Sequence, residues 1–297
     1  MKIKNSKENL KLDKLFPVMF GATLVLIVLR CLQLAKYIDS STGFLTGGSF
    51  INVLFYGIIA ASCLYLVIVS FLSKEGGKVE LAAFEDKNAG IAAAVFGASL
   101  LYDFADSLMD GLAILGNLPF EAYSNNAELT KALMATGALP YILQALFALL
   151  SAAYTFILSK SFAKGSGKAH NSKLLAVMPI AWASFKLITR FIKQISYIKV
   201  SDLFLELIMI SFMILFFIAL SQVISGVYCD DSRWRITALG LSGALLAFTI
   251  NVPRLVFTVF ANEFVNKEYP FCFDDAMFGV FALFVAFAAV KSAKKQA

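Results

Sequence analysis

Three carboxylates lie in one apolar segment of the chain, three cations lie in another, and both triplets have helical spacing. The carboxylates are Asp103, Asp106 and Asp110, and the cations are Lys186, Arg190 and Lys193. Residues three or four apart share one face of a helix, so each triplet forms a charged stripe. Carboxylates can bind cations or protons, and lysine and arginine can bind anionic groups. The two stripes therefore predict a site for a charged ligand.

The rest of the chain has the composition of a membrane protein. Of its 297 residues, 59% are hydrophobic and 15% are charged, and the mean hydropathy is +0.77. A soluble domain could not bury that much apolar surface, so we expect an all-α, polytopic membrane protein. Ionisable residues inside a bilayer are costly and usually functional, which makes the two stripes the leading candidates for a site.

Eight segments are apolar and long enough to cross a bilayer, which takes about 20 residues per helix. They are 16–36, 50–72, 90–115, 138–159, 174–197, 202–225, 236–260 and 273–290. We expect one membrane domain over 16–290, with cytoplasmic tails at 1–15 and 291–297. The sizeable outer loop 116–137 is expected to contain a short helix at the membrane surface.

Lysine and arginine set the expected orientation of these spans. With eight spans, both tails and the loops 73–89, 160–173 and 226–235 share one side, and these segments hold 17 Lys and Arg residues. The other side holds four, counting Lys36 at the outer end of the first span. Because cytoplasmic segments are enriched in these residues, both termini are expected in the cytoplasm of a cell-membrane protein. The asymmetry also explains most of the basic pI of about 9.0, so no nucleic-acid partner is expected.

The two halves of the domain, 16–165 and 174–295, resemble each other in the order of their segments. The fifth span echoes the first, and the third and seventh share GASLL and GALL, which matches Asp106 with Asn251. Apolar helices also resemble one another by chance, but the unchanged order favours a four-plus-four repeat. Four spans in each half would give both the same topology, a parallel repeat about an axis normal to the membrane.

Position along the spans places the charges in the middle and outer parts of the membrane. Odd-numbered spans run outward, so the offset from the inner end measures depth at about 1.5 Å per residue. Asp103 and Lys186 fall near mid-membrane, with the remaining stripe residues further out. Further candidates for binding a solute or ion are Arg30, Glu206, Asn251 and Arg254. The inner halves carry almost no charge, so we expect a cavity open to the outside and closed below by apolar packing.

The deep charges need partners inside the protein. An ionised residue at the bilayer centre costs roughly 2.5–3.5 kcal/mol, so five of them facing lipid would cost on the order of 12–17 kcal/mol. That is comparable with the stability of a whole protein. The charges must be paired, hydrated or neutralised. The simplest arrangement is that the acidic stripe of the third span faces the basic stripe of the fifth.

The run from Asp103 to Asp110 has the spacing DxxDxxxD. This spacing resembles the first aspartate motif of intramembrane aromatic prenyltransferases, and the resemblance implies that the three aspartates hold magnesium against a diphosphate. It covers these eight residues. Tyr102 stands where that family has asparagine, and a second aspartate motif with the family's spacing is missing. The expected topology also puts the run toward the outer face, whereas the family's motif is cytoplasmic.

Three functions remain open at this point. Transport of a small charged or zwitterionic solute, or of a coupling ion, is favoured, with no catalytic residues, metal or cofactor. An enzyme acting on a lipid or prenyl diphosphate is the first alternative. A non-catalytic subunit, whose charges pair within the fold or with a partner membrane protein, is the second. No P-loop, HExxH or nucleophile-elbow pattern occurs, and His170 is the only histidine, so hydrolytic and zinc chemistry lack support.

Overall fold

The structure is a computed structural model that describes residues 14–37, 49–73, 86–119, 125–164, 173–192, 200–226, 232–260 and 270–296. Within these ranges the regular structure is entirely helical, and eight helices are long and apolar enough to cross a membrane. The all-helical architecture is confirmed, and the eight helices support a multi-pass membrane protein. Most of the predicted N-terminal tail lies outside the described residues.

Each predicted span coincides with one helix. The helices are α2 (Leu15–Leu32, continued by the π-helical turn Gln33–Tyr37), α3 (Ser49–Leu72), α4 (Lys87–Gly116), α6 (Ala138–Lys164), α7 (Met178–Ile192, preceded by the 3-10 turn Leu175–Val177), α8 (Val200–Ile224), α9 (Ser232–Val259) and α11 (Phe273–Gln296). The short helix expected in the outer loop is α5 (Asn126–Ala135). The C-terminal segment expected as a tail continues α11 as far as Gln296. The internal repeat stays a prediction.

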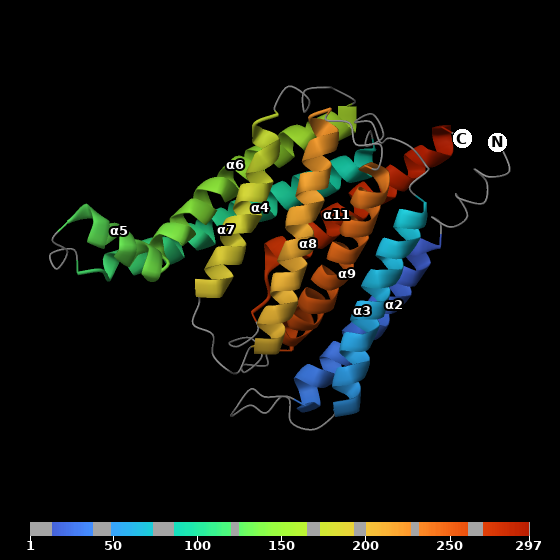
Figure 1. Ribbon diagram of the computed structural model, residues 1–297, viewed down its shortest axis with the longest axis horizontal. Coiled ribbons are helices and arrows are strands. Elements are labelled where there is room, and N and C mark those ends of the chain that lie inside the picture. The colour runs from blue at the N-terminus through green and yellow to red at the C-terminus, as the bar shows by residue number, and fades with distance from the viewer. Residues whose placement is uncertain are drawn as a thin grey trace.

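Helix α9 is the centre of the bundle. It packs against α2, α3, α8 and α11, and 83% of its membrane-spanning window is buried. Figure 1 shows the α2–α3 pair on one side of α9, and α4, α6 and α7 on the other, with α8 and α11 between them. The charged residues of α9 therefore reach neighbours from several parts of the chain.

Large apolar side chains cover the outside of the bundle. Leu24, Val28, Phe50, Val53 and Leu64 are all exposed. An apolar surface of this extent is suited to contact with lipid tails.

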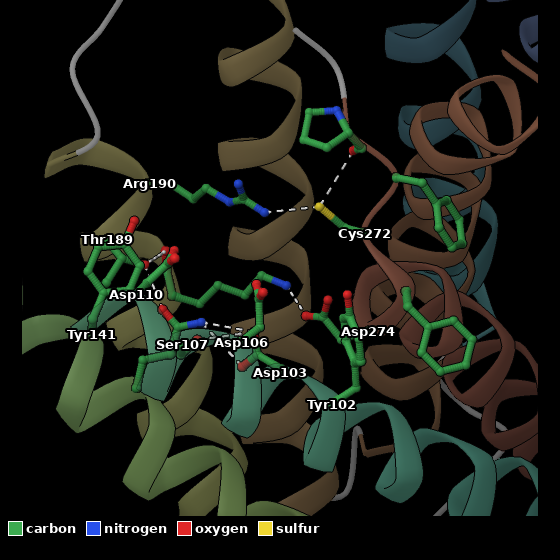
Figure 2. Close-up of a pocket in the computed structure, with 15 residues that line it drawn as sticks. Tyr102, Asp103, Asp106, Ser107, Asp110, Tyr141, Thr189, Arg190, Cys272 and Asp274 are labelled. Carbon is green, nitrogen blue, oxygen red and sulfur yellow. Dashed lines mark hydrogen bonds and ion pairs between the residues drawn. The ribbon is translucent and has the colours of Figure 1, made fainter. Parts of the chain in front are cut away.

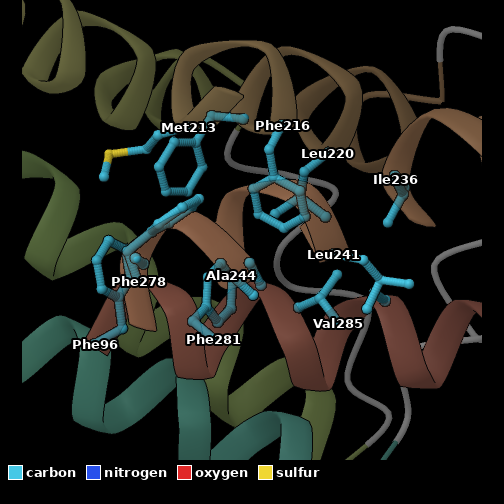
Figure 3. Packing of buried hydrophobic residues seen from close by; sticks show 14 of the residues in the cluster. Phe96, Met213, Phe216, Leu220, Ile236, Leu241, Ala244, Phe278, Phe281 and Val285 are labelled. Carbon is cyan, nitrogen blue, oxygen red and sulfur yellow. The ribbon is translucent and has the colours of Figure 1, made fainter. Parts of the chain in front are cut away.

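Stacked aromatic rings fill the middle of the bundle. Phe96 of α4 stacks on Phe281 of α11 with ring centroids 5.3 Å apart, and Phe217 of α8 lies 5.9 Å from Phe96. Phe216 meets Phe278 edge-on at 5.8 Å, and Figure 3 shows these rings closing the space between the helices. Such ring pairs contribute about 0.5–1.5 kcal/mol each beyond their buried area. We call Phe96, Phe216, Phe217, Phe278 and Phe281 the aromatic cluster; it joins α4, α8 and α11.

Helices α4 and α6 make the most extensive pairwise contact in the bundle. A Cβ atom placed on Gly97 of α4 would lie 2.7 Å from Oγ1 of the buried Thr155 and 3.3 Å from the ring of Phe156. Small residues let membrane helices approach closely, so Gly97 sets the distance between these two helices.

Replacing Gly97 by alanine should destabilise the protein by about 1–3 kcal/mol, because Thr155 must move to admit the methyl group. Gly57 of α3 is the matched control, since a Cβ there meets nothing within 4 Å. Gly57→Ala should be neutral or stabilising by up to about 1 kcal/mol, as for alanine in an open helix position. Thermal unfolding in detergent measures both variants. Equal Tm values would contradict the close contact, and Thr155→Ala added to Gly97→Ala should restore part of the loss.

Candidate functional site

A cavity of about 240 Å³ opens between α4, α6, α7 and the residues that lead into α11. Residues of its wall come from the last turns of α7 and the start of α11. These helix ends lie away from the start of α2 (Figure 1). Its walls are formed by Tyr102, Asp103, Asp106, Ser107, Asp110, Tyr141, Gln144, Lys186, Thr189, Arg190, Pro270, Phe271, Cys272, Phe273 and Asp274, shown in Figure 2. Five predicted site residues therefore share one cavity: both acidic and basic stripes reach it.

Asp103 is held at the cavity wall by neutral donors from two other helices. Its carboxylate accepts a hydrogen bond of 2.7 Å from the indole Nε1 of Trp182 on α7, and bonds of 3.1 and 3.2 Å from Nε2 of Gln144 on α6. Ser107 lies one turn along α4 at 3.5 Å. Among the described residues, no cation lies within ion-pair distance of this carboxylate, although its side chain is buried.

Lys186 is buried at the opposite wall and takes its partners from α11. Its ammonium group pairs with Asp274 and, at 2.5 Å, with Asp275, both in the first turn of that helix. Carboxylates are favoured there because the positive end of the helix dipole lies at the N-terminus. The ammonium also lies 5.3 Å from the ring centroid of Trp182, within range of a cation–π interaction. Lys186 therefore positions the start of α11 against α7.

Arg190 is the more accessible of the two cations that line the cavity. Its Nε lies 3.5 Å from Oε2 of Glu206 on α8, and its side chain is 20% exposed, against 2% for Lys186. A terminal nitrogen donates to Sγ of Cys272 at 3.1 Å (Figure 2). Burial raises the pKa of the Cys272 thiol, so this group remains neutral near pH 7. Arg190 is thus the cation best placed to meet an anionic group in the cavity.

A chain of ion pairs continues behind the cavity toward α2. Asp202 of α8 pairs with both Arg30 of α2 and Arg254 of α9, and Arg254 also pairs with Glu206 at 2.5 Å. Arg30 donates a further bond of 3.0 Å to Gln33 in the π-helical turn. Hydrogen bonds between charged groups are the strong ones, and all of these side chains are buried. This chain joins α2, α8 and α9 and does not line the cavity.

Asn251 of α9 positions the segment that leads into α11. Its side-chain oxygen accepts a bond of 3.2 Å from the backbone N–H of Cys272, and its amide donates to the carbonyl oxygen of Ala247 at 3.1 Å. Phe273 and Asp274 follow directly and form part of the cavity wall. Asn251 therefore acts on the cavity through the backbone.

The predicted site residues fall into two groups. Asp103, Asp106, Asp110, Lys186 and Arg190 line the cavity, whereas Arg30, Glu206, Asn251 and Arg254 lie behind its wall. The two stripes share the cavity, but they do not form the expected direct pairs at Asp103 and Lys186. Side chains of α11 pair with Lys186, and a side chain of α6 donates to Asp103. These two stripe residues therefore have partners other than each other. Lys193 lies outside the described residues.

Sequence reasoning missed four residues that complete the site: Trp182, Gln144, Thr189 and Asp202. Trp182 precedes Lys186 by four positions and Thr189 follows it by three, so both share its helix face. That spacing is a signal that was present in the sequence. Gln144 is an isolated amide in a long apolar helix, and Asp202 begins its helix, where a carboxylate at a helix start is ordinarily solvated.

The aromatic cluster packs against Trp182, which bonds the cavity residue Asp103. Trp182 meets Phe96 edge-on with centroids 5.9 Å apart and lies 6.5 Å from Phe217. Its indole therefore belongs to both regions: the N–H bonds the carboxylate of Asp103, and the ring packs on apolar neighbours. The expected apolar closure of the inner half stays a prediction, because it depends on the orientation of the spans.

The described residues contain no group of three or more His, Cys, Asp or Glu side chains arranged to hold a metal ion. The resemblance of Asp103–Asp110 to a prenyltransferase motif thus gains no support from geometry. No family model, no curated protein and no solved structure matches the chain.

Asp202→Asn should destabilise the protein by about 3–5 kcal/mol, because it leaves two buried guanidinium groups without their shared partner. Arg30→Gln should cost less, since Asp202 keeps its pair with Arg254. Lys291→Gln is the control: Lys291 is exposed and pairs with Asp86 at 3.0 Å, so its loss should cost at most about 1 kcal/mol. Thermal unfolding in detergent ranks the three variants. An Asp202→Asn protein as stable as Lys291→Gln would refute the shared pairing.

Proposed function

We propose that this protein is a multi-pass membrane transporter whose cavity binds a small charged or zwitterionic solute, or a coupling ion, from the outer side of the cell membrane. The supporting observation is a cavity among membrane-spanning helices with carboxylates from α4 and α11 and cations from α7 on its walls. A solute with a positive and a negative group can meet both kinds of wall at once. Such sites lie near the bilayer midplane in many transporters.

A purely structural role explains the cavity less well. Buried ion pairs are inefficient stabilisers, and apolar packing of the same volume is often as good. Ion pairs that only hold helices together do not require a cavity beside them. They also do not require a buried carboxylate that forms no ion pair. Here Asp103 is buried at the cavity wall and its hydrogen bonds come from neutral groups, while the ion pairs of Asp202 already join the helices behind the cavity.

The outward orientation rests on the distribution of lysine and arginine along the chain. The positive-inside rule places both termini in the cytoplasm, and the cavity lies toward the other end of the bundle (Figure 1). The aromatic cluster closes the path between the cavity and the cytoplasmic end. An opening on one side and closure on the other is the arrangement that alternating access requires.

The size of the cavity favours a small solute. Its volume of about 240 Å³ lies below the range of about 300–1,000 Å³ that holds drug-sized ligands. A zwitterion or organic ion the size of an amino acid suits this space and its mixed charges. A prenyl diphosphate is too large to be enclosed by it.

The orientation predicts which positions are accessible from outside the cell. In a background with all four cysteines replaced by serine, a cysteine at Glu128 of α5 should react with an impermeant maleimide on intact cells, because this exposed position lies at the outer end. A cysteine at Lys291, near the end of α11, should react only after permeabilisation. The reversed pattern would invert the proposed orientation.

Uptake into proteoliposomes tests the transport function directly, with a panel of amino acids, small carboxylates and polyamines. We expect saturable accumulation of at least one class, lowered about tenfold or more by Asp106→Asn and by Arg190→Gln, since a lost hydrogen bond to a charged group costs about 1.5–3 kcal/mol. Asp86→Asn, which removes a carboxylate near the cytoplasmic end, should leave uptake unchanged. No saturable flux for any class, or equal flux in all variants, would contradict the proposal.

A further inference from the structure

Asp103 differs from the other buried carboxylates that the structure describes. Asp202, Glu206, Asp274 and Asp275 each form an ion pair with at least one lysine or arginine. Asp103 is 7% exposed and is bonded by an indole, an amide and a hydroxyl. An ionised carboxylate buried without an ion pair is costly, and either a bound cation or a proton would stabilise it.

We propose that Asp103 is a proton-binding site and that its protonation is coupled to solute binding in the adjoining cavity; the coupling rests on the proposed transport function, whereas the proton site does not. The proton comes from hydronium in the cavity, which is left as water, and forms an O–H bond on the Asp103 carboxylate. The group then changes from an acceptor of hydrogen bonds into a donor as well.

A proton suits this carboxylate better than a metal cation. Hard cations need several oxygen ligands around them. The groups directed at the Asp103 oxygens are the N–H groups of Trp182 and Gln144, which present hydrogens and no lone pairs, and the hydroxyl of Ser107 at 3.5 Å. The Ser107 hydroxyl oxygen alone does not provide the several ligands that a hard cation needs. A proton adds to one oxygen and needs a single acceptor nearby.

The side-chain amide of Gln144 can supply that acceptor if it rotates so that its oxygen and nitrogen exchange positions. In the structure its nitrogen faces Asp103 and its oxygen accepts from Oγ1 of Thr189 at 2.7 Å. Oγ1 of Thr189 also lies 3.0 Å from the carbonyl oxygen of Lys186, but a hydroxyl has one hydrogen to donate. After the turn, the Asp103 O–H donates to the amide oxygen, the amide nitrogen donates to Thr189, and Thr189 donates to the Lys186 carbonyl. Every group remains satisfied in both states.

Protonation of Asp103 also affects the aromatic cluster, because Trp182 contacts both. The indole N–H of Trp182 bonds Asp103, while the ring of Trp182 packs on Phe96 and Phe217. An N–H bond to a carboxylate is stronger than one to a neutral acid, so protonation weakens the hold on Trp182. We infer that Trp182 carries the protonation state of Asp103 to the aromatic cluster.

Other titratable or charged groups share the cavity with Asp103 and must be separated from it in any titration. They are Tyr102, Asp106 and Asp110 on α4, Tyr141 on α6, Lys186 and Arg190 on α7, and Asp274 on α11. Cys272 also borders the cavity, and burial raises the pKa of its thiol. Of these groups, Asp106 lies three positions from Asp103 on the same helix and is the closest match as a control.

Tryptophan fluorescence reads the proton site without knowledge of the solute. The chain has two tryptophans, so Trp234→Phe leaves Trp182 as the single reporter. In the full-length Trp234→Phe protein in detergent, emission should change with pH in a single-proton step. Asp103→Asn should abolish the change, and Asp106→Asn should leave its amplitude intact. If Asp103→Asn does not fold, Asp103→Glu, which keeps a carboxylate, must shift the midpoint.

Three results would overturn the proton site: no titration of Trp182, the same titration in Asp103→Asn, or a change driven by sodium at constant pH, which would mark a metal cation instead. The outcome is independent of the transport assay. Titration that depends on Asp103 in a protein with no flux would remove the transport function and leave the proton site. Saturable flux in a protein whose Trp182 emission does not titrate would remove the proton site and leave the transport function.

Discussion

Two arginines from different helices share one carboxylate between apolar helices: Arg30 of α2 and Arg254 of α9 both pair with Asp202 of α8. A guanidinium group stays charged in proteins, so each must be neutralised where it is buried. Rotating any of these helices by one residue, about 100°, would leave a buried charge unpaired, at a cost of several kcal/mol. The orientation of three helices about their own axes follows from this one contact.

The need to neutralise buried charge also positions the helices between Asp202 and the cavity. Glu206, one turn along α8, reaches Arg190 of α7, and Lys186, one turn before Arg190, draws the first turn of α11 against that helix. Asn251 of α9 fixes the backbone that enters α11. The cavity is therefore bounded by α7 and the start of α11, whose positions are set by charge neutralisation, and by the closely packed helices α4 and α6.

The sequence predicted the spans well and the partners poorly, and the reason is physical. Length and apolar composition are local properties, so all eight helices and even α5 could be placed from them. Depth along a helix is also local, which is why Asp103 could be matched in depth with Lys186, and Asp106 with Arg190. Which helices touch is set by long-range packing. The stripes on α4 and α7 were therefore paired with each other, whereas α6 and α11 supply the partners of Asp103 and Lys186.

The buried carboxylates differ in which interactions their protonation would weaken. Protonating Asp202 would weaken its pairs with two guanidinium groups, and protonating Asp274 or Asp275 would weaken a pair with Lys186. Each change would leave a buried cation less well neutralised. Protonating Asp103 disturbs bonds to an amide, an indole and a hydroxyl, all of them neutral. Protonation of Asp103 thus leaves every buried ion pair intact, and these ion pairs keep the surrounding helices in place.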